Sequence, residues 1–280
     1  MMEGVDGVDG LRGVDGVDGV DGIDGVEETK VEKEEKGRVE LKIVEEIGEE
    51  WSIRDIVERR CPRTWEKVFR DARDELAEVD EILNKERLYY PYKKDLFRAF
   101  YLTPLSPIRL VLVGQDPYHN LTGTGDPQAI GLSFSVNQNV QIPSSLRNLY
   151  RELERTIPGF KSPNHGDLSY WAYQGIFLLN MCLTVRPNKP GSHGELWLGF
   201  INKVVNAVCE NNPKVIFMLL GRQSQKIKKL LGERVHIVEA PHPSGINTKF
   251  PFVGSNAFIQ VNDILKKEGL EPLTFYIPSN

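Results

Sequence analysis

The sequence lacks the features that mark membrane-spanning and secreted proteins. None of its 280 residues belongs to a run of about 18 apolar side chains, the length a helix needs to cross a bilayer. The chain does not open with a basic segment followed by an apolar one, so we expect no secretory signal. These absences predict an intracellular protein without a membrane partner, in either the nucleus or the cytoplasm.

Cysteine is scarce, and the patterns typical of metal sites are missing. Cys61, Cys182 and Cys209 are odd in number and far apart, which fits neither a disulfide framework nor a zinc site. The sequence also contains no HxxxH motif, no CxxC motif and no cluster of carboxylates that would suggest a metal centre. We therefore expect free thiols in a reducing compartment, no metal and no cofactor.

Basic residues are few at the start of the chain, where acidic residues are concentrated. Residues 1–50 hold 17 acidic and 6 basic side chains, which leaves 23 acidic and 29 basic ones in the remainder. Glycine recurs every third residue from Gly4 to Gly25 without any proline, which predicts a flexible low-complexity tract rather than a collagen helix. We predict a disordered acidic tail over residues 1–50, with a helical turn near residues 39–47, and one functional domain over residues 51–280. The mildly basic domain is compatible with a phosphate-bearing partner.

Beyond the tail, strand and helix patterns alternate. Short apolar runs predict buried strands at residues 108–113, 176–180, 214–220 and 235–239. Apolar residues at helical spacing predict helices at residues 64–88, 144–156, 167–174, 198–209, 224–231 and 255–267. Such alternation is typical of an α/β protein, here a three-layer α/β/α fold with a central four-stranded, mostly parallel sheet.

That fold class predicts where the functional site lies. In open α/β sheets, ligands bind beyond the carboxyl ends of the strands. The polar residues found there are Gln115 and Asp116, Asn180, Arg222 and His242. A carboxylate, an amide, a cation and an imidazole are therefore expected at one edge of the sheet.

Several segments around these residues resemble a known family. The sequence GQDPYH at residues 114–119 resembles the water-activating motif of family 1 uracil-DNA glycosylases. Further segments resemble that family's base-stacking segment, serine-proline loop, approach to the uracil-reading asparagine and DNA-intercalation loop: residues 129–136, 143–146, 165–169 with 178–180, and 242–244. These motifs occur in the family's order and span roughly residues 60–275.

The resemblance implies a role for each residue around the base. Asp116 would orient or deprotonate the attacking water and stabilise a cation-like sugar, while His242 would donate from a neutral imidazole to uracil O2. Asn180 would pair with uracil N3–H and O4, a pattern that cytosine reverses. Tyr118 would exclude the 5-methyl group of thymine, and Phe134 would stack on the ring.

The resemblance also implies contacts to DNA. Gln115 would offer backbone contacts to the base, and His119 a contact to a phosphate or a water. Arg222 departs from the family pattern, which commonly has a small residue there, and would add a contact to a phosphate. Expected backbone contacts that pinch the DNA come from Ser144, Ser145, Ser192, His193 and Ser244, and Ile246 would be the apolar wedge that replaces the flipped base. The implied enzyme is monofunctional and monomeric. It would excise uracil from single- and double-stranded DNA and so initiate base excision repair.

Two departures from the family pattern stand out. Gly245 and Ile246 occupy positions where the family usually has proline and leucine, and the segment at residues 120–127 is longer than usual. Its glycines and proline predict a flexible loop at the rim of the pocket.

Two other classes of function remain open at the level of sequence. Asp116, His119 and His242 could hold a metal in a hydrolase or nuclease. Alternatively, the chain could be a DNA-binding replication accessory subunit built on a glycosylase scaffold, or an active enzyme with a replication-protein partner.

Overall fold

A four-stranded parallel sheet forms the centre of the molecule. The computed structural model describes residues 47–48, 50–232, 235–244 and 251–279. Strands β1 (Leu110–Gly114), β2 (Ile176–Asn180), β3 (Ile216–Leu220) and β4 (His236–Ala240) lie in the order β2-β1-β3-β4, and every pair is parallel. Every residue of β1, β2 and β3 is buried, as expected for strands covered on both faces. The predicted sheet is confirmed.

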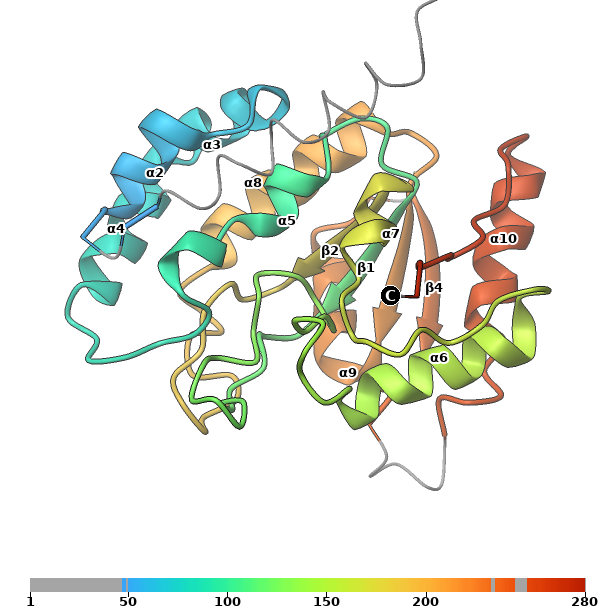
Figure 1. Ribbon diagram of the computed structural model, residues 1–280. Helices are drawn as coiled ribbons and strands as arrows, with labels where there is room; N and C mark the ends of the chain where they lie inside the picture. Colours follow the sequence, from blue (N-terminus) through green and yellow to red (C-terminus); the bar gives the residue numbers. More distant parts are fainter. Residues whose placement is uncertain (1–46, 49, 233–234, 245–250, 280) are drawn as a thin grey trace, which may run out of the picture.

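Helices cover both faces of this sheet (Figure 1). Helix α10 packs on β3 and β4 and against α6, whereas α8 packs with α3 and α4 on the opposite side. The helical segments are α2 (Ile53–Arg60), η2 (Arg63–Trp65), α3 (Glu66–Asp71), α4 (Arg73–Leu83), η3 (Lys93–Asp95), α5 (Arg98–Leu102), α6 (Ser144–Thr156), α7 (Ser169–Tyr173), α8 (Leu198–Asn211), α9 (Gly221–Ser224), η4 (Gln225–Lys229) and α10 (Ala257–Lys267). The three-layer α/β/α arrangement is therefore confirmed. Within the residues described, no helix is both long and apolar enough to span a membrane.

The pattern over residues 64–88 predicted one helix, but the structure has three shorter segments there. The chain bends at Ala72, whose backbone (φ −101°, ψ 12°) leaves the helical region, and α4 ends at Leu83. The bend lets Phe69 on α3 and Leu76 on α4 both reach the core, where they are 1% and 3% exposed. Apolar spacing continues across the bend, so the sequence pattern did not reveal it.

Other boundaries also differ from the predicted ones. Helix α6 begins at Ser144 as expected, but Pro143 is its N-cap residue and no side chain caps it. The helix predicted at residues 224–231 is a short α9 followed by the 3₁₀ segment η4, and α7 is shorter than predicted. Most of the predicted turn near residues 39–47 lies outside the described residues, as does nearly all of the predicted tail.

Candidate active site

The ends of β1 and β2 are tied together where the two strands enter their loops. Gly114 lies opposite Asn180 in the strand register. The amides of Met181 and Cys182 then donate to the carbonyls of Gly114 and Gln115 at 3.0 and 3.1 Å. This pairing continues past the strands, so the loop that carries Asp116 leaves the sheet directly beside Asn180.

Asn180 presents an unpaired amide at this edge. Its residue is only 5% exposed, and within the described chain its side chain makes no hydrogen bond. The amide atoms themselves are not among the buried atoms that lack a partner, so they reach solvent and are available to a ligand. A Cβ atom on Gly114 would lie 2.2 Å from Asn180 Oδ1, so only glycine leaves room for the amide over the end of β1.

Asp116 follows β1 in a position that is only partly exposed to water. Its Oδ2 accepts a hydrogen bond from the amide of Gly191 at 2.5 Å. Burial raises the pKa of Asp116, and this hydrogen bond together with the nearby His119 only partly offsets the rise. The result is a poorly solvated carboxylate, which is a stronger base than an ordinary exposed aspartate. Nδ1 of His119 is also buried and has no hydrogen-bond partner within the described part of the chain.

His242 lies two residues past the end of β4, and its protonation state follows from its contacts. The amide of Ser244 donates to Nδ1 at 3.1 Å, and burial lowers the pKa of the ring. A neutral imidazole that accepts at Nδ1 carries its proton on Nε2, so this ring is a hydrogen-bond donor on that side. Gly221 lies close behind it with φ 85°, and a Cβ atom there would come within 2.7 Å of His242 Cβ.

Tyr118 is held by its hydroxyl group. The hydroxyl donates to the carbonyl of Phe134 at 3.2 Å and lies 3.1 Å from Oγ of Ser145. Burial raises the pKa of Tyr118 to about 12, so the hydroxyl remains protonated at neutral pH. Ser145 was predicted only as a backbone contact to DNA, yet its side chain fixes the ring of Tyr118.

Phe134 has an unusual backbone conformation. Its φ of 62° lies in the left-handed region that residues other than glycine seldom adopt. The flanking Ser133 and Ser135 are fully buried, and their hydroxyls donate to the carbonyls of Leu112 and Gly166. Strain of this kind persists where the surroundings enforce it, often at functional sites. The ring lies 6.2 Å from the ring of His242, at an angle of 44°.

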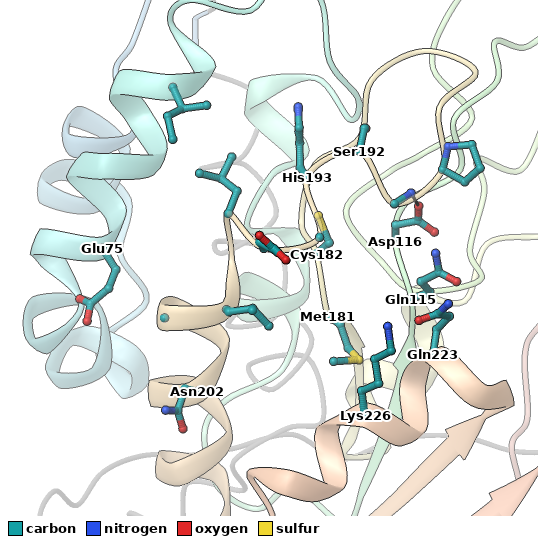
Figure 2. Close-up of a pocket in the computed structure, with 18 of the residues that line it drawn as sticks. Glu75, Gln115, Asp116, Met181, Cys182, Ser192, His193, Asn202, Gln223 and Lys226 are labelled. Atoms are coloured by element: carbon teal, nitrogen blue, oxygen red, sulfur yellow. Dashed lines mark hydrogen bonds between the residues drawn. The ribbon is translucent and has the colours of Figure 1, made fainter.

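A cleft of about 1320 Å³ opens on the Asp116 side of the site (Figure 2). Gln115, Asp116, Ser192 and His193 line it, whereas Tyr118, Phe134, Asn180 and His242 do not. Glu75 of α4 lies on its far side, and Lys226 of η4 points into it below Asp116. The structure thus places the predicted residues in two adjoining groups.

His193 differs from the expected picture of a DNA contact. It is 4% exposed, and its Nδ1 lies 2.8 Å from Oγ1 of Thr184 in the interior. Only its backbone is therefore available at the surface. Ser192 is partly exposed, but its hydroxyl accepts from the amide of Arg186 at 2.8 Å and so shapes the loop.

The remaining predicted DNA contacts lie around this edge of the sheet. Ser144 and Arg222 are exposed at the starts of α6 and α9, and Ser244 is bonded to His242. Ile246 lies outside the described residues. Gly191 was not predicted from the sequence, since no local pattern links it to a carboxylate 75 positions earlier.

The long segment after His119 is a compact hairpin rather than an irregular loop. Leu121 and Pro127 form an antiparallel bridge, and the amide of Thr122 donates to the carbonyl of Asp126 at 2.7 Å. The carbonyl of His119 also accepts from Asn188 of the neighbouring loop at 2.9 Å. The hairpin is thus attached to the rim, with Leu121 48% exposed.

The fold and the site together define a class of protein. An α/β sheet whose carboxyl edge carries a poorly solvated carboxylate, a neutral imidazole and an unpaired amide beside aromatic rings is typical of a hydrolase that acts on a planar heterocyclic base. Among the described residues, no three histidine, cysteine or acidic side chains converge as metal ligands.

Comparison with known proteins identifies the family. The model of the uracil DNA glycosylase superfamily matches residues 100–272. Uracil-DNA glycosylase of Yersinia pestis (strain Pestoides F) is 44% identical over 203 residues, which cover 72% of this chain and 87% of the relative. The enzyme of the same name from Yersinia pseudotuberculosis serotype O:3 (strain YPIII) matches to the same extent. The chain therefore belongs to the uracil-DNA glycosylase superfamily.

Solved structures agree with this assignment. A crystal structure of a mimivirus UNG variant in complex with UGI is 26% identical, with a TM-score of 0.70, and covers 77% of this chain and 89% of that one. Mimivirus uracil-DNA glycosylase, 24% identical, matches the fold with the same TM-score over 92% and 97% of the two chains.

Membership of this family establishes the reaction. The enzyme hydrolyses the N-glycosidic bond between uracil and deoxyribose in DNA, the first step of base excision repair. A noncatalytic accessory subunit on the same scaffold is not favoured, because the relatives that match over most of the chain are named as glycosylases.

Proposed function

We propose that Asp116, His242 and Asn180 divide the work of uracil excision in this enzyme. The observation that carries the proposal is the amide of Asn180, which has no partner within the described residues and lies beside the loop that holds Asp116, on a residue only 5% exposed. An amide that reaches solvent in so confined a position can pair with a ligand, and the Watson–Crick edge of uracil offers matching groups.

Asp116 acts at the sugar. Departure of uracil leaves positive charge on the deoxyribose, which a nearby carboxylate stabilises. The raised pKa of Asp116 makes it a better base for the attacking water, and the bond from Gly191 keeps one carboxylate oxygen fixed while the other faces the reactants. Catalysis therefore needs the ionised form of Asp116.

His242 acts at the departing base. Negative charge develops on uracil O2 as the glycosidic bond breaks, and a donor already in place stabilises it without reorganisation. The lowered pKa and the bond from Ser244 to Nδ1 support a neutral ring that donates from Nε2. Both groups work in their deprotonated states, so the rate rises with pH until each is deprotonated.

Selectivity comes from three side chains. Asn180 pairs with N3–H and O4 of uracil and leaves unpaired groups if cytosine enters. Tyr118, fixed by its hydroxyl, blocks the space that the 5-methyl group of thymine would need, and Phe134 stacks on the ring. Gln115, which directly follows β1 and lines the cleft, offers its backbone to the base.

The DNA lies across the same edge of the sheet. In this proposal the exposed Ser144 and Arg222 contact phosphates, and the hydroxyls of Ser192 and Ser244, whose backbone amides already donate to Lys189 and His242, pinch the strand. The same proposal includes His119 and the backbones of Ser145 and His193 as DNA contacts, and Ile246 as the wedge. Contacts of this kind do not require a second strand, so both single- and double-stranded DNA are substrates.

Excision from uracil-containing oligonucleotides in EDTA tests this assignment. Asp116→Asn lowers the single-turnover rate by about 10²–10⁴-fold, and His242→Leu lowers it by about 10²–10³-fold. DNA affinity persists in both variants, because neither residue is needed for phosphate contacts. Oligonucleotides with thymine or cytosine in place of uracil are not cleaved.

A matched control lies on the same strand as the catalytic histidine. His236, at the far end of β4, contacts Glu268, so His236→Leu leaves the rate unchanged. Near-normal turnover in Asp116→Asn or His242→Leu would overturn the proposed mechanism. Loss of activity in EDTA would instead support the metal-dependent alternative.

A monomeric state and a replication-protein partner stay predictions. A pull-down of polymerase components with the Asp116→Asn chain tests the partner without interference from catalysis. Sedimentation of the free protein tests the monomer.

A further inference from the structure

Helix α6 connects parts of the site that come from opposite ends of the sequence. Ser145, Asn148 and Glu152 are spaced three and four residues apart, which places them along one face of the helix. Each makes a hydrogen bond to a segment outside the helix. This face of α6 therefore supports each of the segments to which its side chains are bonded.

Asn148 contacts the turn that holds the catalytic imidazole. Its Nδ2 donates to the carbonyl of Pro243 at 2.7 Å, and Pro243 directly follows His242. The guanidinium of Arg151 donates to Oδ1 of Asn148 at 3.3 Å, which fixes the orientation of the amide. Two hydrogen bonds thus hold the turn. One lies within it, from the amide of Ser244 to the His242 ring, and the other joins it to helix α6 through Asn148.

One turn further along α6, Glu152 holds the segment that leads into α10. Its side chain is fully buried and accepts from the amides of Gly254 and Asn256 at 2.7 and 2.8 Å, with Arg155 as its charged partner. Two places in the chain after β4, Pro243 and Gly254, are therefore fixed to the same helix.

At its first turn the same helix meets the wall of the base pocket, because Oγ of Ser145 lies against the hydroxyl of Tyr118. Helix α6 thus supports both Tyr118, from the loop after β1, and the turn after β4 that carries His242. A helix is well suited to this task, since its side chains keep a fixed spacing.

We propose that Asn148 is a positioning residue for uracil excision, and that it acts by holding the His242 turn against α6. This inference rests on the catalytic role proposed for His242. Asn148 touches neither base nor sugar in this arrangement. Its loss lets the imidazole turn shift, so Nε2 no longer points accurately at the developing charge.

A double-mutant cycle distinguishes this role from a general structural one. Asn148→Ala lowers the single-turnover excision rate about 5–10-fold, as expected for one hydrogen bond, while the Kd for uracil-containing DNA stays the same. In the His242→Leu background the same substitution changes the rate by less than about twofold, because two residues that act through one group are not additive. Asn148→Asp, which keeps the shape but cannot donate to Pro243, behaves in the same way and serves if the alanine variant folds poorly.

The control is Asn206→Ala, since the side chain of Asn206 on α8 bonds to Asn202 of its own helix and, among the residues described, to no other segment. This variant retains the full rate. An equal loss of rate in the two His242 backgrounds, or a loss confined to DNA affinity, would overturn the positioning role while leaving the proposed function intact. Normal excision by His242→Leu alone would overturn both.

Discussion

The partial burial of the Asp116 carboxylate, which favours the catalytic role proposed for it, also makes the ionised group costly to the fold. Water is partly excluded around it, and one backbone amide does not replace a full hydration shell. Its folded-state pKa is therefore higher than that of an unfolded chain. For a group with this sign, the folded state prefers the protonated form, so ionisation at neutral pH works against folding.

We therefore expect Asp116→Asn to be more stable than the parent at pH 7 despite its loss of activity. The asparagine still accepts from Gly191 through its carbonyl oxygen and carries no charge. Thermal unfolding followed from pH 8 down to pH 4 shows a higher Tm for the variant, and the gain shrinks as the pH falls through the raised pKa of the carboxyl group. The control is Asp74→Asn, which removes one negative charge from an exposed position. A Tm at pH 7 equal to or below that of the parent would contradict the account of Asp116.

At the scale of elements, two strand ends meet at the site without room for another atom between them. Gly114 at the end of β1 faces Asn180 at the end of β2, and the space between them is already filled by the Asn180 amide. Ser133 also lies next to Gly114. A Cβ atom added to Gly114 would come within 3.0 Å of the Cβ of Ser133. The strand end therefore cannot accept a side chain without moving the amide that we propose pairs with uracil.

Gly114→Ala tests this packing. The added methyl group displaces the Asn180 amide, so kcat/KM for uracil falls by at least about tenfold, and the overpacking lowers the free energy of unfolding by about 1–3 kcal/mol. Gly123→Ala in the hairpin is the matched control, because a Cβ there meets nothing within 4 Å. Steady-state excision and urea unfolding give both quantities. Unchanged kcat/KM in Gly114→Ala would mean that Asn180 is not held as described.

The elements also show which features the sequence could predict. Strands β1, β2 and β3 are continuous apolar runs because parallel strands are buried on both faces, so their positions are evident from composition alone. The topology then predicts that the loops after β1, β2 and β4 share one edge. Helix α6 was likewise predicted with its observed bounds.

Contacts between distant segments could not be predicted in this way. The bond from Gly191 to Asp116 and the bond from Asn148 to Pro243 join residues 75 and 95 positions apart, and neither leaves a periodic signal. The resemblance assigned His193 a backbone contact to DNA, and it gave no sign that the ring is buried against Thr184. Side-chain direction within loops depends on tertiary packing, which local patterns do not encode.

At the scale of the whole molecule, charge is divided unevenly between the two parts of the chain. Residues 1–46 contain 15 acidic and 6 basic side chains, whereas the remaining residues contain 25 acidic and 29 basic ones. DNA is a polyanion, so the first part repels it and the second part attracts it. Because both parts belong to one chain, the negative charge of residues 1–46 accompanies the domain whenever it meets DNA.

We expect a chain that lacks residues 1–46 to bind uracil-containing DNA more tightly at low ionic strength. The gain is up to about tenfold at 50 mM salt and vanishes near 0.5 M, where the Debye length falls to a few ångströms. The excision rate at saturating DNA is unchanged, because residues 1–46 include none of the proposed catalytic groups. Titrations of fluorescent DNA across a salt series measure both the gain and its slope.

A full-length variant separates charge from length in this comparison. Replacing the six aspartates of the glycine repeats with asparagine keeps the segment and removes six negative charges: Asp6, Asp9, Asp15, Asp18, Asp21 and Asp24. If repulsion is the cause, this variant reproduces much of the gain at low salt and none at high salt. A gain that persists at 0.5 M would point to a specific contact of the segment with the folded domain, and no gain at low salt would mean that the acidic segment does not affect DNA binding.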